Sequence, residues 1–309
     1  MPELVREEIP AALAGERVDR VVALLTGLTR GEVAELVDAG AVRIGGTAVV
    51  KPSRRLTLGD IVEVDVPDPR VAQPPQPDAS IALEIVYADE EVIVVDKQAG
   101  LVVHPGAGNR EGTLVHALLA RFPDLAALDT GDPTRPGVVH RLDAGTSGLL
   151  VVARTNESYD SLVAQLSART VERVYRALVL GHVEPAAGLI DAPIGRSTGD
   201  PTRMAVVSGG REARTSYDVV AALTNPVAAS ELTCKLETGR THQIRVHLSA
   251  IGHPVVGDER YHGARPAIPL DRPFLHAEAL AFVHPRTGDV VRFGSALPAD
   301  LVRVRGLFT

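Results

Sequence analysis

Residues 140–153 read HRLDAGTSGLLVVA and lead from a polar loop with glycines into an apolar run. The run at residues 149–153 is rich in leucine and valine and has the length of a strand, which predicts a buried strand there. Asp143 lies just before this run, so a rigid element can present its carboxylate while Gly145 and Gly148 leave room for a ligand. An aspartate near glycine is also a common turn former, so the spacing alone leaves both a nucleophile and a turn open.

The rest of residues 81–309 alternates short strands and helices without the regular rhythm of a doubly wound parallel sheet. The pattern predicts strands at residues 91–95, 171–180, 215–222 and 231–237, and helices at residues 113–121, 159–168 and 241–251. We also expect a hairpin in which strands near residues 205 and 217 flank the turn Gly209-Gly210. Because several strand pairs are joined directly by turns, the expected fold class is α+β, with a mixed, largely antiparallel sheet.

The predicted helix at residues 241–251 has an apolar face and a polar face. Ile244, Leu248 and Ile251 share the apolar face at helical spacing. Arg245 lies on the polar face, and Thr241 is the expected N-cap. The polar face can therefore point into a cleft.

A proline-rich stretch at residues 65–80, DVPDPRVAQPPQPDAS, divides the chain. We expect a small domain over residues 1–70, a linker over residues 71–80 and a large domain over residues 81–309. The small domain shows helical spacing at residues 18–25 and 30–39, with Gly40 as the expected C-cap. Short strands follow at residues 42–44, 49–50 and 62–66. This arrangement predicts a small α/β binding module.

The composition is that of a folded globular protein, with 309 residues, 45% of them hydrophobic. Cys234 is the single cysteine, four glutamates fall in the first 25 residues, and no apolar run approaches the ~18 residues of a membrane helix. We therefore expect a cytoplasmic protein without a membrane segment. The net charge of −7 argues against a nucleic-acid binder, which is usually basic, although all but three of the 32 basic residues are arginine, which suits phosphate and base contacts.

Five blocks of sequence, in order along the chain, resemble the RluA-type pseudouridine synthases. They are HRLDAGTSGLLVVA at residues 140–153, DEEVIVVDKQAGLVVHPGAGN at 89–109, VERVYRALVLGH at 171–182, GREARTSYDVV at 210–220 and LETGRTHQIRVHLSAIGHPVVGDERYHG at 236–263. One departure is Gln98, where the family usually has proline after the lysine. Residues 104–118, together with the amino-terminal module, are similar to the RluD branch of the family, which acts on ribosomal RNA of the large subunit.

The resemblance implies a pseudouridine synthase fold and the isomerisation of uridine to pseudouridine in RNA, without a cofactor or a metal. Asp143 matches the family carboxylate that acts at carbon 1 of the ribose, either by adding to the sugar or by removing a ribose proton. Tyr175 matches the tyrosine that stacks on the uracil and is a candidate base for the proton at carbon 5. Arg245 is expected to pair with Asp143, and Arg141 to enter the space vacated by a flipped base. The further candidate substrate-binding residues are His140, Leu142, Thr146, His242 and Gln243.

The amino-terminal module resembles the RNA-binding domain first described in ribosomal small-subunit protein four. Six acidic residues offset its basic ones, so charge gives this resemblance only weak support. The expected partner is ribosomal RNA of the large subunit, or the precursor particles that contain it, with no obligate protein partner. The candidate RNA-binding residues of the amino-terminal module are Arg17, Arg30, Arg43, Lys51 and Arg54.

Two other functions fit parts of the sequence. A non-catalytic RNA-binding or ribosome-assembly factor could keep the same scaffold, but it needs none of Asp143, Tyr175 and Arg245. A retaining glycoside hydrolase using Asp143 would require a second carboxylate about 5 Å away. The ten histidines show no clustered spacing of metal ligands, so we expect structural or RNA-contacting roles for them.

Overall fold

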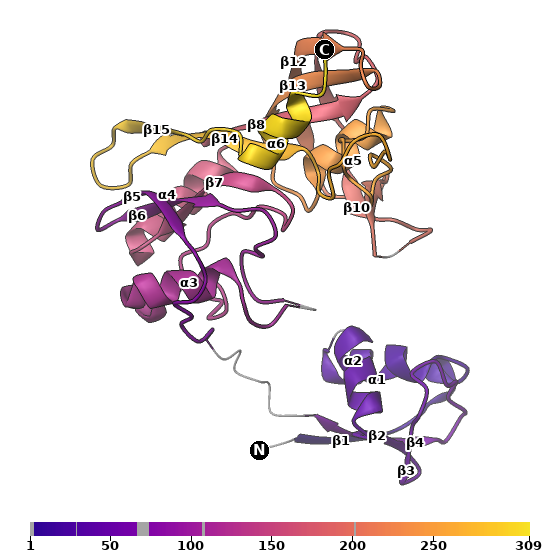
Figure 1. Ribbon diagram of the computed structural model, residues 1–309. Helices are drawn as coiled ribbons and strands as arrows, with labels where there is room; N and C mark the ends of the chain where they lie inside the picture. The colour runs from indigo at the N-terminus through magenta and orange to yellow at the C-terminus, as the bar shows by residue number, and fades with distance from the viewer. Residues whose placement is uncertain (1–2, 29, 67–73, 107–108, 201) are drawn as a thin grey trace. The chain divides into compact units, whose positions relative to one another are not determined.

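The computed structural model describes residues 3–28, 30–66, 74–106, 109–200 and 202–309. The chain divides into two compact units, Met1–Gln73 and Pro74–Thr309, which are described separately (Figure 1). Among the described residues, no helix is long and apolar enough to cross a membrane.

The amino-terminal unit is a four-stranded antiparallel sheet packed against two helices. The strand order is β1-β4-β2-β3, with β1 Glu3–Glu8, β2 Val42–Ile44, β3 Thr47–Ala48 and β4 Ile61–Val66. The helices are α1 (Val18–Thr26) and α2 (Arg30–Asp38), after the short 3₁₀ helix η1 (Ala11–Leu13). Val18, Val22 and Val33 are fully buried between the helices and the sheet.

Two details of this unit differ from the prediction. Strand β1 was not expected, because ELVREE carries charges and lies at the sheet edge, where β4 is its one partner strand among the described residues. Strand β3 ends at Ala48, and Val49 then closes the hairpin by donating its N–H to the Val42 carbonyl. Gly40, two residues after the last residue of α2, has a φ of 71°, the left-handed conformation that commonly ends a helix, so the expected role of Gly40 in ending the helix is confirmed.

The large unit is built on one nine-stranded sheet, so the prediction of a mixed, largely antiparallel α+β sheet is confirmed. The strand order is β5-β6-β7-β14-β8-β13-β12-β9, and β15 pairs with β14. Among the described strands of this sheet, β7 and β14 are the one parallel pair. The bounds are β5 Glu84–Ala88, β6 Val92–Lys97, β7 Ser147–Ala153, β8 Glu172–Leu180, β9 Ala187–Asp191, β12 Arg214–Leu223, β13 Ala229–Leu236, β14 Leu275–Val283 and β15 Val290–Gly294.

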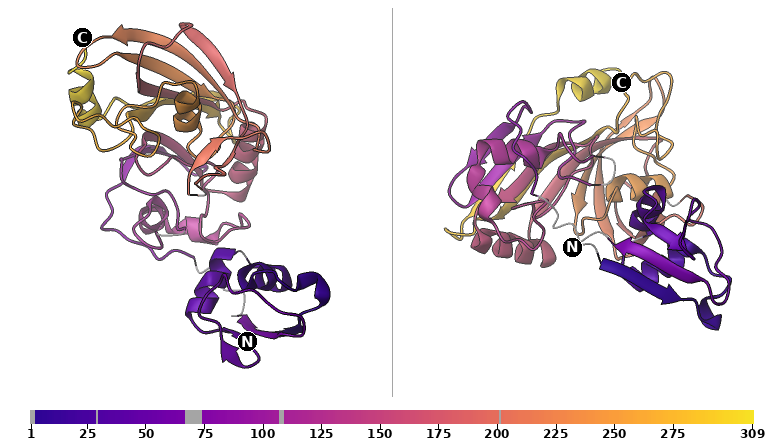
Figure 2. Two further views of the ribbon diagram at one scale, coloured as in Figure 1. Left: turned by 90° about the vertical axis from the view of Figure 1, so that its right-hand side faces the viewer. Right: turned by 90° about the horizontal axis from the view of Figure 1, so that it is seen from below.

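Helices cover both faces of the sheet, which explains the continuous apolar runs in its central strands. In β7, Leu150 and Val152 join the core that contains α3, whereas Leu149 and Val151 join the core that contains α4. Figure 2 shows these layers from two further directions. The helices are α3 Leu114–Arg121, η2 Pro123–Ala127, α4 Asn156–Ser167, α5 Gln243–Ala250 and α6 Ala299–Arg305.

Two predictions for the large unit are wrong. Residues 204–206 form β11 (Met204–Val206), which pairs with β10 (Ile194–Arg196) and not with β12, so no hairpin spans Gly209-Gly210. Gly210 lies so close to β10 that a Cβ there would be 2.6 Å from the Ile194 carbonyl carbon, which explains the glycine. Helix α5 begins at Gln243, after a left-handed residue at position 242, so Thr241 is not its N-cap. Residues 241–245 at the start of α5 line one side of the cavity described below.

Candidate active site

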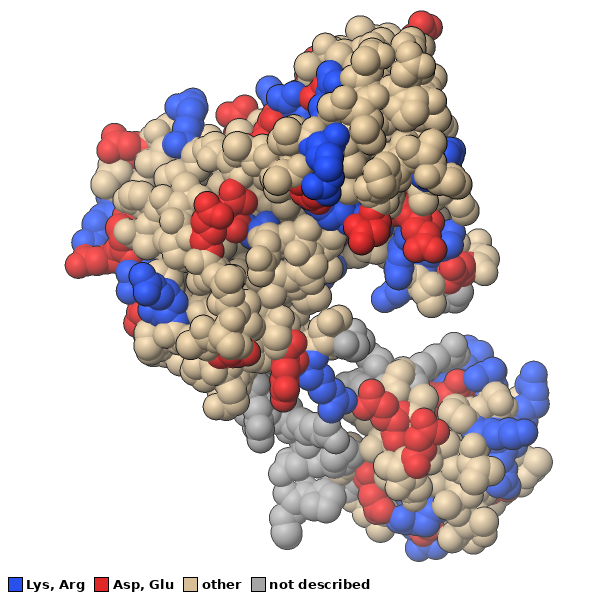
Figure 3. Space-filling view, viewed as in Figure 1, with Lys and Arg blue, Asp and Glu red and all other residues tan. Residues whose placement is uncertain are grey.

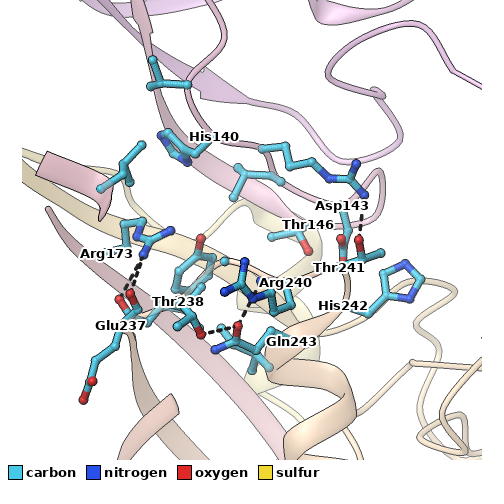
Figure 4. Close-up of a pocket in the computed structure, with 18 of the residues that line it drawn as sticks. His140, Asp143, Thr146, Arg173, Glu237, Thr238, Arg240, Thr241, His242 and Gln243 are labelled. Carbon is cyan, nitrogen blue, oxygen red and sulfur yellow. Dashed lines mark hydrogen bonds between the residues drawn. The ribbon is translucent and has the colours of Figure 1, made fainter. Parts of the chain in front are cut away.

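A cavity of about 480 Å³ opens beside the loop that carries Asp143 (Figure 4). Three parts of the chain contribute most of its lining: residues 138–146 before and at the edge of β7, the start of β8, and residues 236–245 from the end of β13 to the first turn of α5. The end of α4 with Arg169, and His104, Arg135 and Leu275, complete the lining. The cavity is rich in arginine. Its arginine residues are Arg135, Arg141, Arg169, Arg173, Arg240 and Arg245.

Arg245 joins Asp143 to a second carboxylate. Its Nη1 donates to Asp143 Oδ2 at 3.0 Å, while its Nε and Nη2 donate to the two oxygens of Asp258 at 2.6 and 2.9 Å. Asp258 is 1% exposed, and the side chain of Asp143 is 16% exposed. The Tyr261 ring packs on the guanidinium, with its centroid 5.1 Å from Arg245 Cζ. Burial lowers the pKa of Arg245, but its bonds to Asp258 and the charge of Asp143 more than offset this, so Arg245 stays charged.

A buried lysine forms a hydrogen bond to the backbone of the loop that carries Asp143. Lys97, at the end of β6, is 1% exposed and donates from Nζ to the carbonyls of Gln98, Leu101 and Ala144 at 2.9, 2.8 and 3.2 Å. Gly100 also donates its N–H to the Ala144 carbonyl at 2.8 Å. Burial lowers the pKa of Lys97 to about 7. Lys97 was not among the predicted site residues, although a lysine at the end of the apolar run VIVVDK was a visible signal.

His140 and Thr146 flank Asp143 on the same loop. His140 Nε2 accepts the Val151 N–H of β7 at 3.1 Å, and burial lowers the pKa of this histidine to about 3, so the ring is neutral. Thr146 is 2% exposed. Within the described ranges, neither Thr146 Oγ1 nor His140 Nδ1 has a hydrogen-bond partner, and both residues line the cavity. Leu142 is buried in the core and lines the cavity as well.

The start of α5 supplies the opposite wall. Arg141 is exposed, and its Nη2 donates to Thr241 Oγ1 at 3.3 Å. His242 adopts a φ of 57° and shares a 2.8 Å hydrogen bond through Nδ1 with the Tyr261 hydroxyl. Gln243 is 3% exposed and fills its hydrogen-bonding capacity inside the protein. Its side chain bonds to Thr238, Arg240, Arg214 and Thr215.

Strand β8 contributes Arg173 and Tyr175, which point to the same side of the sheet because they are two residues apart. Tyr175 is 5% exposed, and burial raises its pKa to about 12. Arg173 is 7% exposed and was not singled out in the sequence. Figure 4 shows it beside the carbonyls at the end of β13. Both side chains therefore form the deep part of the cavity.

The candidate RNA-binding residues of the amino-terminal unit fall into two groups. Arg17 pairs with Asp19, and Arg43 pairs with Asp65 through two bonds of 2.7 and 2.9 Å. Lys51 and Arg54 are exposed. The side chain of Arg30 lies outside the described residues. Figure 3 shows basic and acidic side chains together on the visible face of this unit, in line with its mixed charge.

Comparison with known proteins agrees with the fold. Residues 91–250 match the RNA pseudouridylate synthase family, and residues 16–62 match the S4 domain family. A protein of Chloroflexus aurantiacus named as an RNA pseudouridine synthase is 46% identical over 95% of this chain and 90% of its own length. The ribosomal large subunit pseudouridine synthase D of Zymomonas mobilis is 42% identical over 94% of this chain and 92% of its own.

A solved structure agrees as well. The human RNA pseudouridylate synthase domain containing 1 is 29% identical, with a TM-score of 0.58, over 76% of this chain and 91% of its own. The chain therefore belongs to the RNA pseudouridylate synthase family. It is an RNA pseudouridine synthase with an amino-terminal S4 domain, an enzyme that isomerises uridine to pseudouridine in RNA. The expected family, fold and RNA partner are confirmed.

Proposed function

We propose that this enzyme modifies uridines in ribosomal RNA of the large subunit, in the cytoplasm, with Asp143 as its catalytic carboxylate. The observation that carries the assignment of Asp143 is its position in the arginine-rich cavity, at 3.0 Å from the buried Arg245. Relatives from Zymomonas mobilis and Xanthomonas campestris, at 42% and 43% identity over nearly the whole chain, are named for the large ribosomal subunit. Their extensive similarity supports the same substrate class here.

Asp143 promotes cleavage of the bond between carbon 1 of the ribose and nitrogen 1 of uracil. That cleavage leaves carbon 1 of the ribose short of electrons, and a carboxylate beside it either bonds to this carbon or removes a neighbouring ribose proton. Arg245 aims the carboxylate because one of its amino groups holds Asp143 while the rest of its guanidinium is fixed by Asp258. Asp258 is thus a positioning residue that acts through Arg245.

The other residues hold the target nucleotide. The reacting atoms of a stacked uridine are out of reach, so the base must leave the helix. Arg141 is exposed at the mouth of the cavity and suits the space that the base leaves, and the Tyr175 ring suits stacking on the uracil. The Thr146 hydroxyl, which has no hydrogen-bond partner in the described part of the chain, and the neutral His140 ring suit contacts with polar atoms of the nucleotide.

The two alternative functions lose support from the geometry. Among the described residues that line the cavity, Glu237 is the one acidic residue besides Asp143. It pairs with Arg214 at 2.8 Å and points away from Asp143 in Figure 4, so it does not suit the acid of a glycoside hydrolase. A protein that only binds RNA has no use for a carboxylate fixed in a cation-lined cavity, because it repels phosphates.

Pseudouridine mapping in cells provides the test. Large-subunit ribosomal RNA from cells lacking this gene is expected to lose one or a few pseudouridines, which the wild-type gene restores and an Asp143→Asn gene does not. The same sites remaining modified in the deletion strain would reject this RNA as the substrate. Restoration by the Asp143→Asn gene would reject Asp143 as the catalytic residue.

A further inference from the structure

Arg173 is a buried arginine that has no counter-ion among the described residues. It is 7% exposed, as is Arg245, but Arg245 meets two carboxylates. Within the part of the chain that the structure describes, no carboxylate lies within ion-pair distance of Arg173. Burying a cation without a partner costs stability, and burial lowers the pKa of Arg173 accordingly. A protein that tolerates this cost has a use for the charge.

The hydrogen bonds of Arg173 are also incomplete. Its Nη2 donates to the carbonyls of Leu236 and Glu237 at long distances of 3.3 and 3.5 Å, and its Nε is buried without a partner among the described residues. Gly239 leaves room for the guanidinium, since a Cβ at that position would lie 3.0 Å from Arg173 Nη1. The side chain is therefore held in place, with donor capacity to spare, in the wall of the cavity.

Its position separates it from the other arginines of the cavity. Arg135, Arg141 and Arg169 are exposed at the rim, where the phosphates of an RNA chain remain in water. Arg173 lies deep, on the same face of β8 as Tyr175. A base that stacks on Tyr175 brings its edge, and not its phosphate, to this depth.

We propose that Arg173 is a further catalytic residue, whose guanidinium faces a carbonyl oxygen of the uracil and stabilises the negative charge that the base carries once its bond to the ribose breaks. This inference rests on the isomerase activity and on the placement of uracil beside Tyr175.

The charge follows from the electron balance of the reaction. When the bond between nitrogen 1 and the ribose breaks, its electron pair leaves with the base and spreads over nitrogen 1 and the oxygens at carbons 2 and 4. The base then turns and forms a bond from carbon 5 to carbon 1 of the ribose, and the proton of carbon 5 is lost while nitrogen 1 gains one. No oxidant or reductant is needed. The detached base carries more negative charge than the uridine does before its bond to the ribose breaks. A cation already in place in a site that excludes water therefore stabilises the detached base more than it stabilises the bound uridine.

The experiment compares Arg173→Met and Arg173→Lys with the wild-type enzyme on an RNA fragment that the wild type modifies. Single-turnover rates at saturating enzyme, RNA affinity over a salt series and thermal unfolding are measured together. Arg176→Met on the same strand is the matched control. Arg176 lies on the opposite face and pairs with the buried Glu231 at 2.7 Å, so its loss leaves part of a buried carboxylate unpaired.

Arg173→Met is expected to lower the single-turnover rate by roughly 10²- to 10³-fold, the usual effect of removing one donor that stabilises a developing anion. The dissociation constant is expected to change less than about twofold, and the melting temperature not to fall, because no carboxylate loses its partner. Arg173→Lys keeps the charge and is expected to recover part of the rate. The control is expected to melt earlier and to keep the wild-type rate.

Two results would overturn this role. Weaker binding, a salt slope lower by roughly 0.7 and an unchanged rate at saturation would make Arg173 a phosphate contact. A melting temperature lowered as in the control, with an unchanged rate, would make it a structural cap of the β13 carbonyls. Both variants can be studied on any RNA that the wild-type enzyme modifies, so a wrong ribosomal substrate would be distinguished from a wrong role for Arg173.

Discussion

Arg245 is shared between a reacting carboxylate and a buried one, which changes what its removal should do. Arg245→Met takes the partner from Asp143 and also leaves Asp258, 1% exposed, as an unpaired buried charge. We expect the rate to fall steeply and the free energy of unfolding to fall by about 3–5 kcal/mol. The second variant, Arg245→Met with Asp258→Leu, should recover most of the stability and none of the rate. Urea unfolding and single-turnover kinetics measure both effects, and near-normal turnover in the double variant would show that the pairing with Asp143 is not catalytic.

The raised pKa of Tyr175 predicts how the reaction rate depends on pH. Its pKa is raised to about 12, so the phenol is neutral at pH 7 and the phenolate fraction increases tenfold for each pH unit above that. If the phenolate removes the proton from carbon 5, the rate of that step should rise with pH between 6 and 9. Tyr175→Phe should bind RNA normally and lose about 10²-fold or more in product formation. A rate that does not change with pH, together with full activity of Tyr175→Phe, would show that Tyr175 stacks on the uracil but does not act as the base.

The individual site residues were predictable from the sequence to different degrees. Asp143, Tyr175 and Arg245 stood out because motif blocks surrounded them. Asp258 lay inside one of these blocks without a visible partner, since its bond to Arg245 spans two segments that only the fold brings together. Arg173 was passed over because a charged residue in a strand is usually exposed, and only the structure shows that it is buried.

Strands β7 and β14 form the parallel pair that carries the Asp143 loop, and they approach unusually closely at Gly148. This residue has a φ of 111°, and a Cβ there would lie 2.3 Å from the Ala277 carbonyl oxygen. Gly148→Ala should therefore lower the free energy of unfolding by about 1–3 kcal/mol. It should also displace the loop that carries Asp143, and so lower the rate of pseudouridine formation. Gly199→Ala, where the new Cβ meets nothing within 4 Å, is the control. Equal stability of the two variants would show that this contact can relax.

The prediction of elements succeeded where local pattern and final environment agree. The apolar run at residues 149–153 became a strand buried on both faces, and the alternation at residues 62–66 became β4. It failed where distant contacts decide the structure. Strand β14, with the alanine-rich sequence LHAEALAFV, was missed because it forms only by insertion between β7 and β8. The start of α5 was misplaced because His242 takes a left-handed conformation that binds Tyr261, which propensity does not indicate.

At the level of the whole chain, we expect residues 1–73 to raise RNA affinity without taking part in the chemistry. The truncated enzyme should modify short RNA fragments at high concentration but lose affinity and site choice on long ribosomal RNA, because an attached second binding surface raises the effective concentration of the catalytic unit. Each lost phosphate contact should lower the slope of log affinity against log salt by roughly 0.7 to 0.9. Within the unit, Lys51→Gln with Arg54→Gln should lower this slope, whereas Arg43→Gln, whose partner is Asp65, should change it less. Identical slopes and sites for full-length and truncated enzyme would contradict RNA binding by this unit.

The most informative measurement is tritium release from carbon 5 of uridine in large-subunit ribosomal RNA by the wild-type enzyme and by Asp143→Asn. The substitution keeps the size of the side chain and leaves Arg245 paired with Asp258, so the fold should persist. We expect the wild-type enzyme to release tritium in step with pseudouridine formation, and Asp143→Asn to release none while binding the RNA with wild-type affinity, because phosphate contacts supply most of that affinity. Unchanged tritium release by Asp143→Asn would contradict the assignment of Asp143 as the catalytic carboxylate.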